Sequence, residues 1–156
     1  MLVVVSIISA ILLDRVKFYQ EQAEKTTMEA TAAAIQAGLH LRMAGYLATD
    51  RAQDVVFLVA ENPMDWLARK PDSYAGSFDR IGAENVPEGS WYFDPSDRSL
   101  VYRVRYGRAF GSDSNGKKEV RYRANVQYGQ LGDTPGIRGI KVLEFVPVNP
   151  YRWDID

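Results

Sequence analysis

Four arginines are the residues in this chain most suited to binding chemistry. Arg103 and Arg105 lie in one segment of alternating apolar and polar residues, and Arg121 and Arg123 lie in another. Alternation predicts that all four occupy the outward face of two neighbouring strands, where four like charges need neutralising. Glu119 and carboxylates from other chains would neutralise them on an ordinary surface, and we favour this interpretation. The alternative is an anionic ligand such as DNA phosphate.

Residues suited to catalysis or metal binding are few. His40 is the only histidine and cysteine is absent, so no transition-metal site is indicated. Glu21 and Glu24 share a helical face, as paired catalytic carboxylates would, but Lys25 follows Glu21 at the spacing of a helical ion pair, which favours a solvated face or a contact between subunits. Residues 112–116 form an oxygen-rich loop that could hold calcium, although they lack the closing glutamate of an EF-hand. We predict that the chain is not an enzyme and has no cofactor, with calcium as the one alternative.

Composition indicates one globular domain with little overall charge. A chain of 156 residues is close to the usual size of a single domain. Its 19 basic and 20 acidic side chains give a net charge of -1, which provides no global attraction toward nucleic acid or an anionic membrane. Because cysteine is absent, stability must come from packing, and the redox compartment stays undetermined.

The apolar residues are concentrated at the start of the chain. Residues 2–13 contain no charge, and no proline occurs before Pro63, which predicts one helix from about residue 2 to about residue 47. This helix would be about 70 Å long, so its first half must project from the head and needs a cover of lipid or other subunits. The apolar run reaches about 20 Å, short of the roughly 30 Å core of a bilayer, and it lacks the flanks of a cleavable signal peptide. The residues expected to carry assembly are Leu2, Val3, Val4, Val5, Ile7, Ile8, Ile11, Leu12, Leu13, Asp14, Arg15 and Tyr19.

Short elements are predicted between the long helix and the strands. Asp50 with Gln53 has the form of a capping box at the start of a short helix. Asn62 with Pro63 has the form of an N-cap followed by proline at the first helical position. Residues 70–89 are rich in Pro, Gly, Ser and Asp, which predicts a surface loop.

The second half of the chain predicts an antiparallel meander of four strands. Apolar and polar residues alternate in it, which indicates one buried face, and the helical stripe of Met28, Ile35 and Leu39 would cover that face. We therefore predict an α+β fold, in which a long N-terminal spine helix packs on a four-stranded antiparallel sheet. Residues 1–25 would project as the assembly helix and residues 26–156 would form the head. The predicted strands cover residues 91–93, 100–106, 119–128 and 139–146.

The first twenty residues resemble the mature N-terminal helix of the type IV pilins and of the pseudopilins of type II secretion. Residues 1–13 look like that helix just after its near-terminal glutamate, and Tyr19-Gln20 falls where the family carries an aromatic residue followed by glutamine. The resemblance implies a structural subunit that polymerises with copies of itself through this helix. It also implies residence in the inner membrane, followed by transfer into a cell-surface filament by an assembly machinery.

Two departures from the family pattern affect assembly. No glutamate precedes Met1, and we expect the true mature N-terminus to lie upstream of it. Lys17 and Ser9 stand where many relatives have proline and glycine, which predicts a helix that melts less on assembly than theirs.

Three functions stay open at this stage. The first, which we favour, is a subunit of a type IV pilus-like filament. The second is a minor or major pseudopilin of a type II secretion system, which would be periplasmic. The third is a membrane-anchored module that binds an anionic partner such as DNA through its arginine-rich sheet face. Filament formation separates the first two from the third.

Overall fold

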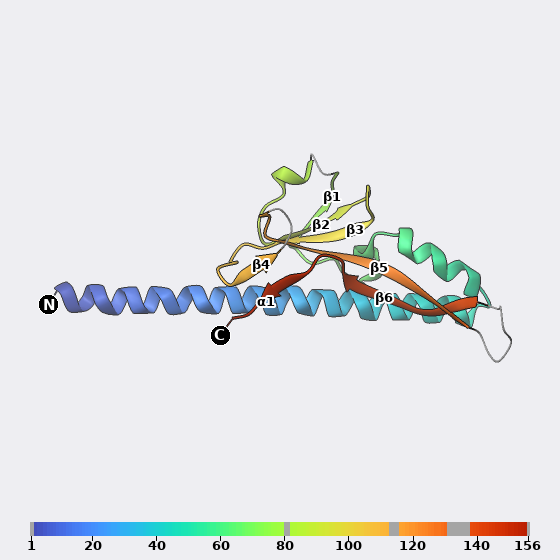
Figure 1. Ribbon diagram of the computed structural model, residues 1–156, viewed down its shortest axis with the longest axis horizontal. Helices are drawn as coiled ribbons and strands as arrows, with labels where there is room; N and C mark the ends of the chain where they lie inside the picture. Colours follow the sequence, from blue (N-terminus) through green and yellow to red (C-terminus); the bar gives the residue numbers. More distant parts are fainter. Residues whose placement is uncertain (1, 80–81, 113–115, 131–137, 156) are drawn as a thin grey trace.

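One long helix forms the spine of the molecule. The computed structural model describes residues 2–79, 82–112, 116–130 and 138–155. Helix α1 (Leu2–Ala48) runs through the first of these segments, and at 1.5 Å per residue it is about 70 Å long. Its first part extends beyond the head, which packs on its second part (Figure 1). The predicted spine helix is therefore confirmed.

A five-stranded sheet packs against α1. In spatial order the five strands are β1 (Tyr74–Ser77), β2 (Ser90–Asp94), β3 (Ser99–Arg103), β5 (Glu119–Gln130) and β6 (Arg138–Pro147). β1 runs parallel to β2, and the other neighbouring strands are antiparallel. A separate two-stranded sheet joins β4 (Phe110–Ser112) to β7 (Tyr151–Trp153). The α+β class is confirmed, whereas the predicted number of four strands is wrong.

The additional strand comes from the segment predicted as a surface loop. Within residues 70–89 lie β1 and the short 3₁₀ helix η3 (Gly82–Asn85). Val86 at the end of this segment packs on Tyr92 and Val101, which point away from α1 into a second apolar cluster. Both faces of the sheet are covered here, so the prediction of a single buried face is also wrong.

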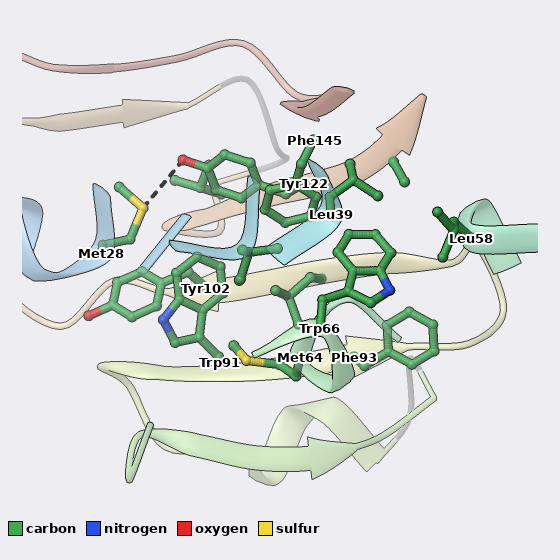
Figure 2. Packing of buried hydrophobic residues seen from close by; sticks show 14 of the residues in the cluster. Met28, Leu39, Leu58, Met64, Trp66, Trp91, Phe93, Tyr102, Tyr122 and Phe145 are labelled. Atoms are coloured by element: carbon green, nitrogen blue, oxygen red, sulfur yellow. Dashed lines mark hydrogen bonds between the residues drawn. The ribbon is translucent and has the colours of Figure 1, made fainter. Parts of the chain in front are cut away.

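The main core lies between α1 and the sheet. Met28 and Leu39 are completely buried on the helix, as their spacing predicted. Opposite them, the ring of Trp91 packs against that of Tyr102 with centroids 4.9 Å apart. Figure 2 shows these side chains meeting between the helix and the strands, with the Tyr122 hydroxyl donating to the Met28 sulfur at 3.5 Å.

Two 3₁₀ helices connect α1 to the sheet. η1 (Ala52–Ala60) follows Arg51 and has no side-chain cap. Asp50 has a φ of 57°, because it ends α1 in the left-handed conformation, and an N-cap needs an extended backbone. The predicted capping box is therefore wrong. η2 (Pro63–Trp66) starts as predicted, because the Asn62 side chain accepts a hydrogen bond from the Met64 amide at 3.1 Å.

Candidate assembly surface and its junction with the head

The apolar beginning of α1 is uncovered. We call residues 3–19 the stem. Its large aliphatic side chains from Val3 to Leu13 are between 52% and 70% exposed. Ile11, Leu12 and Leu13 succeed one another at about 100° around the helix axis, so apolar groups face every direction. A helix that is apolar all round is normally buried by several neighbours rather than by one.

Charged and aromatic residues complete the stem. Arg108 of the head donates a hydrogen bond to Asp14 at 2.8 Å, and both side chains are exposed. Arg15 is exposed as well. Tyr19 is 62% exposed, and its ring meets the edge of Phe18 with centroids 5.5 Å apart. In the part of the chain that the structure describes, no helix has both the length and the hydropathy required to cross a membrane.

Glu24 fixes the loop that follows β3 to the helix. Its carboxylate accepts hydrogen bonds from the Tyr102 hydroxyl at 2.9 Å, from the Arg105 amide at 2.7 Å and from the Tyr106 amide at 2.6 Å. Burial raises the pKa of Tyr102 well above its ordinary value, and the charge of Glu24 adds to this effect. The phenol therefore stays a donor. These three bonds turn the chain toward α1, which explains why β3 ends at Arg103 rather than at Tyr106 as predicted.

Glu21 joins the helix to the small sheet. It is only 5% exposed, and its Oε1 accepts hydrogen bonds from the Ala109 amide at 2.8 Å and from the Trp153 indole at 2.9 Å. Lys25 donates to the Trp153 carbonyl at 2.8 Å and lies 4.0 Å from Glu29. The prediction of a solvated face or of a contact between subunits is therefore wrong for Glu21. Lys25 contacts Glu29 and the Trp153 carbonyl rather than Glu21.

We call these contacts of Glu21, Glu24 and Lys25 the junction. Sequence reasoning missed it, although one signal was available. Glu21 precedes Met28 by seven residues and therefore lies on the same helical stripe as the core. A carboxylate in that position requires buried donors, and the head supplies them.

The arginines of β5 are neutralised within the head. Arg121 lies 3.0 Å from Glu119, 3.2 Å from Asp97 and 3.6 Å from the buried Asp94. Burial alone would lower the pKa of Arg121, but the neighbouring carboxylates, above all Glu119, raise it above its ordinary value. Arg123 lies 3.6 Å from Asp97. Most of the charge on this strand is therefore already paired.

The two other arginines bind backbone carbonyls. Arg103 is opposite Glu119 in the sheet and donates to the carbonyls of Ala83, Glu84 and Val86. Arg105 lies beyond the end of β3 and donates to the Glu88 carbonyl at 2.9 Å. Arg103 and Arg121 line a cleft of about 730 Å³ in which basic and acidic side chains balance, so it offers no net positive charge to an anion. The charged residues lining it are Arg103, Lys117, Lys118, Arg121, Glu84, Glu88, Asp97 and Glu119.

Metal ligands do not gather in the described residues. Among them, no group of three or more histidine, cysteine, aspartate or glutamate side chains could hold a metal ion. The loop named above as the calcium alternative falls largely on residues 113–115, which lie outside the described residues.

Comparison with protein-family models, with curated proteins and with solved structures gives no match.

Proposed function

We propose that this chain is a structural subunit that polymerises through its N-terminal helix into a type IV pilus-like filament. The observation that carries the proposal is the stem, whose large aliphatic side chains from Val3 to Leu13 are more than half exposed on all sides of the helix. A single partner would cover one side only, so several identical stems gathered in a bundle satisfy it best. The resemblance of residues 1–20 to the pilin helix supports the same conclusion.

Before assembly, the stem rests in the inner membrane, and it then moves into the bundle. Burying eight half-exposed aliphatic side chains is worth on the order of 10 kcal/mol relative to water. The gain relative to lipid is much smaller, because lipid tails are as apolar as the neighbouring stems. An assembly machinery must therefore extract the subunit, and the finished filament extends from the cell surface.

The junction has a mechanical role in this proposal. Glu21 and Glu24 attach the head to α1 just after the end of the stem, through five hydrogen bonds to their carboxylates. The direction of the stem relative to the head is thereby fixed, and a regular polymer needs the same direction in every copy. No catalytic step forms part of this function.

A pseudopilin would use the same stem and head in a shorter, periplasmic polymer. Imaging decides between them, because a pilus subunit forms long surface filaments. DNA binding by the arginines is not favoured, because their guanidinium groups already have carboxylate or carbonyl partners in the head.

Sedimentation and electron microscopy after detergent removal test the proposal. Ile8→Glu places a charge in the stem, and Asn125→Glu places the same charge at an exposed position of β5 as the matched control. The wild type and the control should form filaments, whereas Ile8→Glu should remain dispersed with an unchanged circular dichroism spectrum. A wild-type chain that stays monomeric, or an Ile8→Glu chain that assembles equally well, would contradict the proposal.

A further inference from the structure

Two cations directly follow the aliphatic part of the stem. Arg15 and Lys17 are exposed, and no ion pair or hydrogen bond joins the side chain of either to another described residue. Asp14, the one acidic residue of the stem, is already paired with Arg108 of the head at 2.8 Å. The stem therefore ends in two positive charges for which the described chain supplies no counter-ion.

The two cations lie on different sides of the helix at nearly the same height. At 1.5 Å and 100° per residue, Arg15 and Lys17 are about 3 Å apart along the axis and about 160° apart around it. Asp14, which Arg108 of the head approaches, lies on the side between them. A single carboxylate of a protein partner would reach only one of these cations, whereas an anionic layer that surrounds the helix reaches both.

The height of these cations suits the headgroup layer of a bilayer. The stem extends beyond the head (Figure 1), and its aliphatic side chains from Val3 to Leu13 span about 15 Å, half of the roughly 30 Å hydrocarbon core. Because charged side chains stay out of that core, an inserted stem holds Arg15 and Lys17 at the boundary between lipid tails and headgroups. Tyr19, which is 62% exposed, lies about 6 Å beyond Arg15, and aromatic rings are enriched at this boundary.

Carboxylates on the helices of neighbouring copies are poorly suited as counter-ions. Every acidic side chain of α1 already has a partner within its own chain. Asp14 pairs with Arg108, the two carboxylates of the junction accept hydrogen bonds from the head, and Glu29 lies 4.0 Å from Lys25. Charge complementarity therefore favours an anion that the helix itself does not supply.

We infer that Arg15 and Lys17 bind the phosphates of anionic lipid headgroups before assembly, an inference that rests on the membrane-resident stage of the proposed function. Both side chains are long enough to keep the charged end among headgroups while their methylene groups lie along the apolar boundary. Each basic residue at an anionic surface strengthens binding about fivefold, so the pair should give about a 25-fold preference for an anionic membrane. The contact also sets the depth of the stem, so that all subunits present the junction at one height above the membrane.

Partition between two kinds of vesicle tests this inference with the full-length chain. The chain is released from a non-ionic detergent into equal amounts of phosphatidylcholine vesicles and of dense, sucrose-loaded vesicles that also contain about 30% phosphatidylglycerol. Centrifugation separates the two kinds. At low salt the wild type should be about 25-fold enriched in the anionic vesicles. The enrichment should disappear at about 1 M salt, where electrostatic attraction extends only about 3 Å.

Matched variants separate the effect of these two charges from that of the net charge. Arg15→Gln combined with Lys17→Gln should lower the enrichment about 25-fold. Arg98→Gln combined with Lys70→Gln removes the same charge from exposed positions of the head, and this variant should keep most of the enrichment. Arg15→Lys combined with Lys17→Arg should also keep it, because both positive charges remain. Excess dissolved glycerol phosphate should not compete, because one small anion cannot reach both cations.

The results also separate this inference from the filament proposal. Unchanged enrichment in the Arg15 and Lys17 glutamine variant, an equal loss in the head variant, or competition by glycerol phosphate would overturn the headgroup contact. Wild-type filaments without enrichment in anionic vesicles would overturn it as well and leave the proposed function standing. Enrichment that depends on Arg15 and Lys17, in a chain that forms no filaments, would overturn the filament and leave the headgroup contact standing.

Discussion

Glutamine substitutions at Glu21 and Glu24 should have different effects, because the two carboxylates use their oxygens differently. Both hydrogen bonds to Glu21 end on Oε1, and glutamine retains that oxygen. Glu24 accepts on Oε1 from Tyr102 and Arg105 and on Oε2 from the Tyr106 amide. In Glu24→Gln one of these two oxygens becomes an amide nitrogen, so a side-chain N–H donor must face a backbone N–H donor.

The magnitudes follow from the contacts that each variant loses. A hydrogen bond to a charged group contributes about 1.5–3 kcal/mol and a neutral one about 1 kcal/mol. Glu21→Gln loses only the charge assistance, so we expect a destabilisation of about 1 kcal/mol. Glu24→Gln leaves one donor facing another, and we expect it to lower the free energy of unfolding by about 3 kcal/mol. Glu21→Ala leaves the Trp153 indole and the Ala109 amide without an acceptor, and we expect it to lower the free energy of unfolding by about 4 kcal/mol.

Denaturant unfolding of the full-length chain in a non-ionic detergent measures these differences. Trp66, Trp91 and Trp153 are all buried, so their fluorescence reports loss of the head. Equal slopes of free energy against denaturant would show that the variants share one unfolded state. The reasoning is refuted if Glu21→Gln costs as much as Glu21→Ala, or if Glu24→Gln is no more destabilising than Glu21→Gln.

Two further predictions concern helix packing and alkaline pH. A Cβ at Gly38 would lie 2.6 Å from the Trp66 carbonyl oxygen, whereas one at Gly45 would have no neighbour within 4 Å. Gly38→Ala should therefore lower the melting temperature and Gly45→Ala should raise stability by about 0.5–1 kcal/mol; thermal unfolding checks both, and the same sign for both would contradict this. Burial raises the pKa of Tyr92 from 10.0 to about 12 and also raises that of Tyr122. The neutral phenols thus contribute stability that is complete below pH 10 and lost as the pH rises toward 12, and a tyrosinate absorbance titration of the native and denatured chains should show this separation. Coincident titrations of the two states would contradict it.

The sequence predicted the elements that repeat a pattern over many residues. α1 was predictable because residues 2–48 contain no proline and because Met28, Ile35 and Leu39 recur on one face. The strands β3 and β5 were predictable from alternation, β6 from a weaker alternation, and β2 from its three consecutive aromatic residues. β1 was not, since its four residues, with Gly76 at a φ of 118°, are too few and too loop-like to show a period.

The candidate site was predictable only in part. Exposure of the stem follows from its apolar composition and from the length of α1, both of which are local properties. The junction depends on Glu21 and Glu24 meeting donors about 80 to 130 residues away in the chain, and no local pattern encodes such pairings. Arg103, Arg121 and Arg123 lie on the strands predicted for them, whereas Arg105 lies beyond the end of β3. Arg121 pairs with Asp94 at the end of β2 and with Asp97 in the turn that follows, and the position of both relative to β5 depends on sheet topology.

Electron microscopy of native, full-length material sheared from cells, combined with mass spectrometry of its subunits, tests the central claim most directly. We predict long filaments built chiefly from this chain, with the stems bundled along the filament axis and the heads on the outside. A dispersed monomer without filaments, or filaments in which the stems lie on the outer surface, would contradict the account.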